Sequence, residues 1–275
     1  MENIRQAIER AKESGYPETA AHAQLGPAIQ PQSHQNIGAP SVAQSSRSEV
    51  VLNGPHLESK RIITHDISDP RAKSFDMLRT QVLQSMDIKS WHLLGTTSPS
   101  AGCGKTVVSI NLALSIARQQ EKPVLLVDLD LQKPQVANYL GLPCDRGMIS
   151  LLEGRTDLPS TIIRACIKNQ KLSILPCEAS TPHSSEWMAS RKMSAIIQTI
   201  KREFKGWTVI FDLPPLLTGD DVITLLPQID CVLFVAAIGT TTISEIKECY
   251  KHLEATSVVR VVLNKSSEMP ATYYS

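Results

Sequence analysis

The stretch that decides the fold is SPSAGCGKT, residues 98–106. It follows a short apolar run, His92–Thr97, and precedes a helical pattern over Lys105–Arg118. A strand, a glycine loop and a helix in this order favour a phosphate-binding loop, because glycines let backbone N–H groups point at phosphate oxygens and the helix N-terminus adds partial positive charge. The alternative is a glycine-rich turn that joins a strand to a helix by chance.

Two side chains of this loop predict what it binds. Lys105 can reach the terminal phosphates of a nucleotide, and the Thr106 hydroxyl can bind Mg²⁺. Pro99 stands where the usual pattern has its first glycine. The predicted nucleotide contacts in the loop are Ala101, Gly102, Cys103, Gly104, Lys105, Thr106 and Val107.

Three aspartates follow apolar runs that have the length of buried strands. Asp128 and Asp130 come after Pro123–Val127, and Asp212 comes after Thr208–Phe211. Ligands of open parallel sheets bind beyond the carboxyl ends of the strands, so we expect these carboxylates to converge on the phosphate-binding loop. The alternative is that each aspartate caps a turn or the next helix.

The roles expected of these carboxylates follow from their chemistry. Asp128 and Asp212, together with Thr106, are predicted to hold Mg²⁺ directly or through water. Asp128 or Asp130 is predicted to accept a proton from an attacking hydroxyl. The predicted catalytic residues are Lys105, Asp128, Asp130 and Asp212.

The remaining chain alternates short apolar runs with helical patterns, which indicates an α/β fold with a mostly parallel sheet covered by helices on both faces. The predicted strands are His92–Thr97, Pro123–Val127, Leu172–Pro176, Thr208–Phe211, Cys231–Ala236 and Val258–Leu263. The predicted helices are Pro70–Met86, Lys105–Arg118, Ser150–Glu153, Ser185–Phe204, Asp220–Pro227 and Thr242–Glu254.

Composition excludes several classes of protein. The 275 residues carry 28 Lys and Arg against 27 Asp and Glu, so no basic excess points to nucleic acid. No apolar run approaches the roughly 18 residues of a membrane helix, and the N-terminus lacks a signal-peptide pattern. The six cysteines never form C-x-x-C, which disfavours a zinc ribbon or a thioredoxin-type centre. We therefore expect a soluble, cytoplasmic protein with reduced thiols.

The chain divides into four predicted parts. Residues 1–14 form a short helix, and residues 15–68, rich in Pro, Gly, Gln, Ser and Ala, form a disordered linker. Residues 69–265 form the phosphate-loop domain. Residues 266–275 form a flexible tail that ends with Tyr273 and Tyr274.

Taken together, these motifs resemble those of the bacterial tyrosine kinases, the autokinases that accompany polysaccharide co-polymerases. The shared pattern is the glycine loop, an apolar strand ending D-x-D at Asp128 and Asp130, and an apolar strand ending D-x-P-P at Asp212. The resemblance covers residues 69–275. Further matching segments are Ser74–Thr80, Gly147–Gly154, Ser185–Ser190, Gly219–Asp221 and Val261–Lys265.

Related families on the same scaffold fit less well. Chromosome-partitioning and division-site ATPases carry a second lysine five residues before the loop lysine, where this chain has Ser100. Iron–sulfur carriers need paired cysteines. Asn264 stands where similar folds read the adenine ring through a side-chain amide, and a turn-forming asparagine is the alternative.

The resemblance implies an autokinase that uses Mg²⁺ and ATP to phosphorylate Tyr273 and Tyr274, on a neighbouring subunit, and so regulates exopolysaccharide or capsule assembly. It also implies a homo-oligomer and a membrane chain-length determinant, or co-polymerase, as the partner that recruits the chain to the inner membrane.

Three departures from the family pattern keep a second hypothesis open. Gln132 replaces an arginine, and the tail has only two tyrosines. The family's assembly helix, E-x-x-R-x-x-R, retains only its last arginine, Arg79. The alternative is an ATP-binding switch or scaffold of the same machinery that transfers no phosphate to protein.

Overall fold

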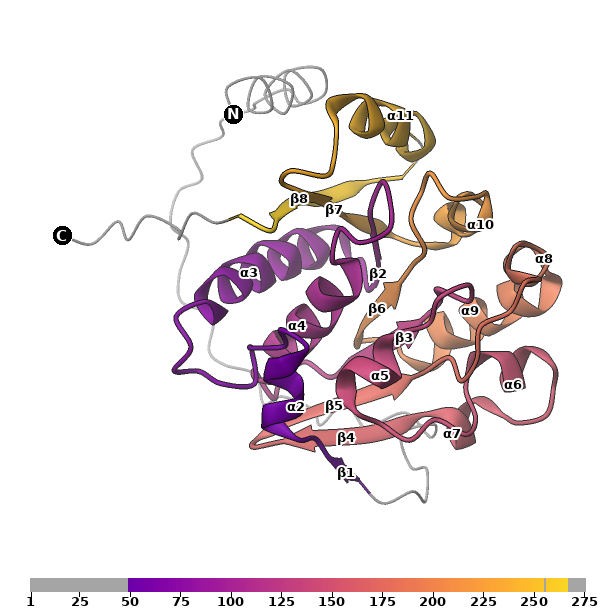
Figure 1. Cartoon of the computed structure of the whole chain (residues 1–275). Coiled ribbons are helices and arrows are strands. Elements are labelled where there is room, and N and C mark those ends of the chain that lie inside the picture. The colour runs from indigo at the N-terminus through magenta and orange to yellow at the C-terminus, as the bar shows by residue number, and fades with distance from the viewer. Residues whose placement is uncertain (1–48, 255, 267–275) are drawn as a thin grey trace, which may run out of the picture. The chain divides into compact units, whose positions relative to one another are not determined.

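An eight-stranded sheet runs through the part of the chain that this computed structural model describes, residues 49–254 and 256–266 (Figure 1). The strand order is β1-β4-β5-β3-β6-β2-β7-β8, and every neighbouring pair is parallel except β4 with β5. The predicted mostly parallel sheet is confirmed. The strands are β1 (Val50–Val51), β2 (Leu93–Thr97), β3 (Val124–Asp128), β4 (Ile163–Ile167), β5 (Gln170–Leu175), β6 (Thr208–Asp212), β7 (Cys231–Ala237) and β8 (Val258–Asn264).

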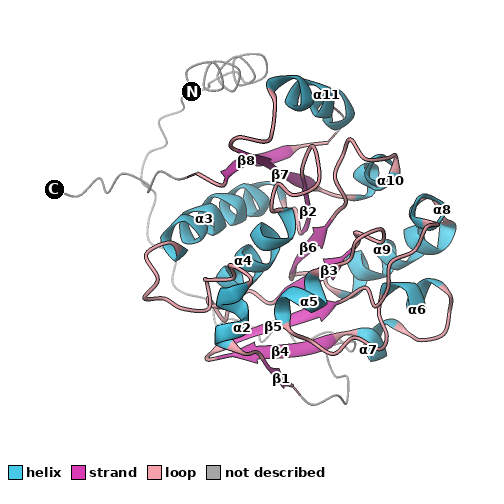
Figure 2. Ribbon diagram, in the orientation of Figure 1, coloured by secondary structure: helices cyan, strands magenta, loops and turns pink. Residues whose placement is uncertain are grey.

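Helices lie on both sides of this sheet, as Figure 2 shows. The α-helices are α2 (Gly54–Ser59), α3 (Ala72–Lys89), α4 (Lys105–Ala117), α5 (Val136–Leu140), α6 (Met148–Leu152), α7 (Leu158–Thr161), α8 (Ser184–Met188), α9 (Arg191–Glu203), α10 (Asp221–Leu225) and α11 (Ile243–Leu253). A short 3₁₀ turn, Leu226–Gln228, follows α10.

Alternate residues of the buried strands supply the two faces of the core, because successive side chains of a strand point to opposite sides. Leu94 and Leu126 belong to the cluster that contains the buried residues of α3 and α4. Their neighbours Leu93 and Leu125 belong to the other cluster, with the buried residues of α9, α10 and α11. Strands buried on both faces explain the continuous apolar runs of the sequence.

The predicted start of the domain at residue 69 is wrong, because residues 50–68 belong to the ordered domain. β1 pairs with β4, and the side chains of Leu52, Leu57 and Ile62 are buried in the core cluster of α3 and α4. The Asn111 side chain in α4 accepts hydrogen bonds from the backbone of Ile63 and Thr64 at 2.8 and 3.1 Å. A few well-placed aliphatic residues therefore anchor a segment whose composition indicated a linker.

Two further elements differ from the prediction. The single helix expected over Ser185–Phe204 is divided into α8 and α9, because the Ser190 hydroxyl caps α9 by accepting from Met193 N at 3.1 Å. The antiparallel strand β4 was not predicted, although its alternating burial is that of a half-buried strand.

Several predictions concern residues outside the described part of the chain. These are the helix at residues 1–14, the linker up to residue 48, and the tail tyrosines Tyr273 and Tyr274. Within residues 49–254 and 256–266, none of the helices has the length and apolarity that a membrane span requires.

Candidate nucleotide-binding site

The phosphate-binding loop connects β2 to α4, and its backbone depends on two glycines. Gly102 and Gly104 have φ of +82° and +91°, a region that L side chains rarely adopt. A Cβ at Gly102 would meet nothing within 4 Å, so open space lies on that side of the loop. Lys105 and Thr106 begin α4, where backbone N–H groups have no partner within the helix.

The carboxyl ends of β3, β6 and β2 are neighbours in the sheet, and this adjacency brings the predicted residues together (Figure 1). Lys105 Nζ donates to Asp130 Oδ2 at 2.7 Å and lies 3.7 Å from Asp212 Oδ2. The three side chains are at most 10% exposed. The loop lysine and two of the three predicted aspartates therefore form one buried ionic cluster.

Asp212, at the end of β6, is held by two hydroxyl groups of α4. Thr106 Oγ1 donates to its Oδ2 at 2.6 Å, and Ser109 Oγ donates to its Oδ1 at 3.1 Å. The Thr106 contact joins two of the three groups predicted to bind Mg²⁺. Ser109 was not predicted, although a serine one turn after Thr106 in a mostly apolar helix was a usable signal.

Asp128 has a different environment. Its Oδ1 accepts from the backbone N–H of Asp130 at 3.2 Å, and its Oδ2 accepts from Gln135 N and Val136 N, both at 3.0 Å. Both oxygens thus hold the turn after β3 and the start of α5. This is the contact pattern of the capping alternative, and the metal role of Asp128 stays a prediction.

Burial is the main influence on the pKa values of Asp128 and Asp212. Burial, helped by the charge of Asp212, raises the pKa of Asp128 to about 8. Burial also raises the pKa of Asp212, although Lys105 and the Thr106 hydroxyl oppose the change. Burial lowers the pKa of Lys105, but the charges of Asp212 and Asp130 outweigh it, so the ammonium stays charged. Lys105 is thus the cation of an acidic cluster.

Asn264, the last residue of β8, contacts the loop directly. Its Nδ2 donates to the Cys103 carbonyl oxygen at 2.9 Å. Cys103 Sγ also lies 3.5 Å from Thr241 Oγ1, in the turn before α11. The structure therefore brings Asn264 to the predicted site, where it supports the loop backbone.

These residues fit a nucleotide with Mg²⁺. The loop offers open space beside Gly102 and unpaired N–H groups at the start of α4. Thr106, Asp130 and Asp212 offer the oxygen donors that Mg²⁺ prefers, and Mg²⁺ commonly takes one or two carboxylates plus phosphate oxygens. Among the described residues, no group of three or more His, Cys, Asp or Glu forms a ready metal site by itself.

A polar contact that was not predicted connects the loop after β3 to the starts of α8 and α10 beside this site. The buried Asp221, at the start of α10, accepts from Gln132 Nε2 at 3.2 Å and from the Ser185 hydroxyl. Gln132 follows the D-x-D aspartates, so this contact reaches the loop that carries Asp130. The matches at Ser185–Ser190 and Gly219–Asp221 were the available signal.

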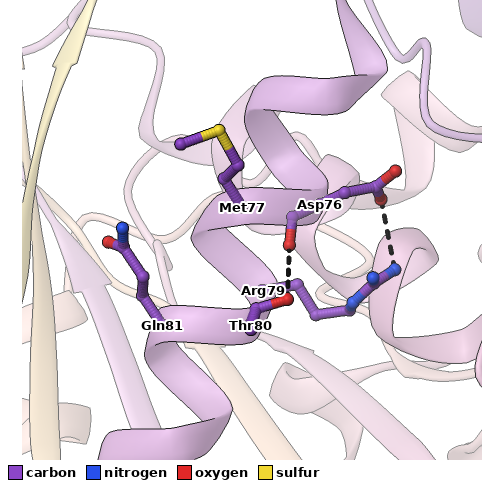
Figure 3. Close-up of a pocket in the computed structure, with 5 residues that line it drawn as sticks. All are labelled: Asp76, Met77, Arg79, Thr80 and Gln81. Carbon is purple, nitrogen blue, oxygen red and sulfur yellow. Dashed lines mark hydrogen bonds and ion pairs between the residues drawn. The ribbon is translucent and has the colours of Figure 1, made fainter. Parts of the chain in front are cut away.

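A shallow pocket lies elsewhere, on α3, with a volume of about 330 Å³ (Figure 3). It is lined by Asp76, Met77, Arg79, Thr80 and Gln81. Arg79, the arginine retained from the assembly pattern, donates to Asp76 Oδ1 at 3.1 Å and to the Ser115 carbonyl at 3.0 Å. Arg118 Nη2 also donates to Asp76 at 3.0 Å. Arg79 is therefore engaged within its own chain.

The fold and the loop define this protein as a P-loop nucleotide-binding domain. Residues 94–272 match the family described as the CobQ/CobB/MinD/ParA nucleotide binding domain, and the chain belongs to that family.

Comparison with individual proteins indicates a narrower class than the family match does. The chain is similar to EpsB of Ralstonia nicotianae, with 29% identity over 83% of this chain and 29% of that protein, so it spans less than a third of that relative's length. It is 26% identical to the tyrosine-protein kinase CpsD of Streptococcus agalactiae over 72% of this chain and 84% of that one. The crystal structure of the VpsO kinase domain superposes with a TM-score of 0.62 at 27% identity, over 71% of this chain and 96% of that one. The resemblance to bacterial tyrosine kinases is thereby confirmed.

Proposed function

We propose that this chain is an ATP-dependent protein-tyrosine autokinase that regulates exopolysaccharide or capsule synthesis and export. The observation that carries the proposal is the convergence of Lys105, Thr106, Asp130 and Asp212 at the start of α4. The similarity to the tyrosine-protein kinase CpsD supports protein tyrosine as the acceptor, and the similarity to the VpsO kinase domain supports phosphoryl transfer.

In the proposed site, backbone N–H groups of residues 101–106 would bind the phosphates of ATP. Thr106 and Asp212 would hold Mg²⁺, which supplies charge neutralisation at the phosphates when bound. Lys105 would contact the transferred phosphoryl group. Asn264 would hold the loop through Cys103 and lie beside the base.

The proposed reaction moves the γ-phosphoryl group to a tyrosine hydroxyl. The tyrosine oxygen forms a bond to the γ-phosphorus while the bond to the β,γ-bridging oxygen breaks, and ADP leaves. Asp130, the carboxylate nearest to Lys105, would accept the hydroxyl proton. The proposed acceptors are Tyr273 and Tyr274 of a neighbouring copy. Positioning and charge stabilisation would supply most of the acceleration.

The proposed partner is a membrane chain-length determinant that activates the chain and recruits it to the inner membrane. Residues 1–14 are the proposed docking helix and residues 15–48 the proposed tether. A tethered docking helix would raise the effective concentration of the partner.

One observation favours the alternative, an ATP-binding switch or scaffold without protein phosphotransfer. Arg79, the arginine retained from the assembly pattern, donates to Asp76 and Ser115 of its own chain. The kinase would produce phosphotyrosine, and the switch or scaffold would not. We would incubate the chain with Mg·ATP and the cytoplasmic segment of its co-polymerase and then map phosphotyrosine by mass spectrometry. Phosphate on Tyr273 or Tyr274 supports the kinase, and its absence from all tyrosines, with ATP bound, supports the switch.

A further inference from the structure

The contact between Lys105 and Asp130 is the feature of the site that the proposed reaction does not explain. Lys105 must bind nucleotide phosphates, yet its ammonium makes a 2.7 Å hydrogen bond to Asp130 Oδ2. Both side chains are at least 90% buried, so water screens the pair little. A charge-assisted contact of this kind competes with any other partner of the lysine.

The other two aspartates do not depend on Lys105 in the same way. Both oxygens of Asp128 accept backbone N–H groups, and both oxygens of Asp212 accept hydroxyl groups of α4. Asp130 Oδ1 accepts from Lys133 N at 3.0 Å, and its Oδ2 has Lys105. Asp130 is thus the aspartate whose side-chain partner is the nucleotide-binding lysine itself.

We infer that the Lys105–Asp130 pair is a latch that withholds Lys105 from the nucleotide until a divalent cation takes the place of its ammonium beside Asp130 and Asp212. Asp130 is then a positioning residue that acts through Lys105, in addition to its proposed role in proton transfer. The inference rests on the nucleotide-binding half of the proposed function and does not require phosphotyrosine.

Charge balance explains why the exchange needs a divalent cation. When Lys105 turns to the phosphates, it leaves behind buried carboxylates with no cation, and an unpaired buried charge is strongly unfavourable. Thr106, Asp130 and Asp212 present hard oxygen donors, which suit Mg²⁺ better than an ammonium. Nucleotide binding should therefore be coupled to Mg²⁺ through Lys105, and the coupling must be reciprocal.

The test is isothermal titration of ATP, in EDTA and in Mg²⁺, into the full chain and two variants. Asp130→Asn removes the carboxylate of the latch. Asp220→Asn is the matched control, because it removes one negative charge from an exposed aspartate at the same edge of the sheet. The control separates the latch from a general decrease of negative charge near the phosphates.

In EDTA, we expect Asp130→Asn to bind ATP about tenfold more tightly than the wild type, since a charge-assisted contact no longer holds Lys105. Asp220→Asn should change the affinity by less than about twofold, as expected of an exposed charge. Mg²⁺ should strengthen ATP binding more in the wild type than in Asp130→Asn.

Two results would overturn the latch: Asp130→Asn binding metal-free ATP no more tightly than the wild type, or Asp220→Asn showing the same gain. If Asp130→Asn does not fold by circular dichroism, Asp130→Ser provides the same test, because its hydroxyl can still accept from Lys133 N. A chain that shows this response and makes no phosphotyrosine would contradict the kinase and leave the latch supported.

Discussion

Gly104 gives the sharpest quantitative prediction, because two separate costs of an alanine at this position can be read from the structure. The φ of +91° is left-handed, which costs an L residue about 1 to 2 kcal/mol. The added Cβ would also lie only 2.3 Å from Asn264 Nδ2, so the amide must move and give up its hydrogen bond to the Cys103 carbonyl. That bond contributes about 1 kcal/mol. Gly104→Ala should therefore destabilise the fold by about 2 to 3 kcal/mol.

Gly102→Ala is the matched control. Its φ of +82° carries a similar backbone cost, but a Cβ there meets nothing within 4 Å. We expect it to cost only the backbone strain, about 1 to 2 kcal/mol. Urea denaturation, followed by circular dichroism, measures both values with the same slope.

A double-mutant cycle isolates the clash. In an Asn264→Ala background no amide obstructs the Cβ, so Gly104→Ala should cost about 1 kcal/mol less than in the wild type. Equal costs of Gly104→Ala in the two backgrounds, or equal costs of Gly102→Ala and Gly104→Ala in the wild type, would refute the proposed contact between β8 and the loop.

Three further predictions follow from other contacts. Lys105→Met should weaken Mg·ATP binding about tenfold or more in isothermal titration, because it removes the cation that faces the phosphates; unchanged affinity would refute the site. Asp76→Ala should lower the free energy of unfolding by about 2 to 3 kcal/mol in urea denaturation, because it leaves the guanidinium groups of Arg79 and Arg118 without their carboxylate. Burial raises the pKa of Asp230, but hydrogen bonds from His92 N, Leu93 N and Lys201 lower it below its usual value. Because its folded-state pKa is depressed, ionised Asp230 stabilises the fold at pH values above its unfolded-state pKa, and this stabilisation is lost as pH falls through the folded-state pKa. Asp230→Asn should therefore be less stable than the wild type at pH 7, and the difference in their free energies of unfolding should decrease as pH falls below about 4. A difference in unfolding free energy that stays constant from pH 7 to pH 3 would contradict the depressed pKa of Asp230.

The sequence predicted the parts of the fold whose signals are local. Strands buried on both faces appear as continuous apolar runs, and the loop has its own pattern of glycine, lysine and threonine. Ligands of open parallel sheets bind beyond the carboxyl ends of the strands, which is why Asp130, Asp212 and Lys105 could be expected to lie together before any coordinates.

The elements that were missed depend on contacts distant in the sequence. β1 has two residues and exists because it pairs with β4, more than a hundred positions later. Leu57 is buried because α2 packs in the core cluster of α3 and α4, which the composition of its own segment does not reveal. The separation of α8 from α9 at Ser190 does not depend on distant contacts. A serine directly before a helical pattern is a local signal of a helix start, and this signal was missed.

The roles of the site residues also depend on contacts that the sequence does not reveal. Residue type and strand position suggested overlapping metal-binding and proton-accepting roles for the three aspartates, but the structure distinguishes them by their hydrogen-bond partners. Asp128 holds a turn, Asp212 contacts the hydroxyls of α4, and Asp130 pairs with Lys105. Such a difference arises from the relative positions of loops after β3 and β6 and has no counterpart in a linear motif.

The most direct test of the proposed function mixes two defective chains in Mg·ATP with the cytoplasmic segment of the co-polymerase. One chain carries Lys105→Met and keeps its tyrosines. The other carries Tyr273→Phe and Tyr274→Phe and keeps its nucleotide site. The account predicts that mass spectrometry finds phosphate on Tyr273 or Tyr274 of the Lys105→Met chain only when the second chain is present. No phosphate on that chain, while each variant remains folded and the second binds ATP, would contradict transfer from this site to a neighbouring tail.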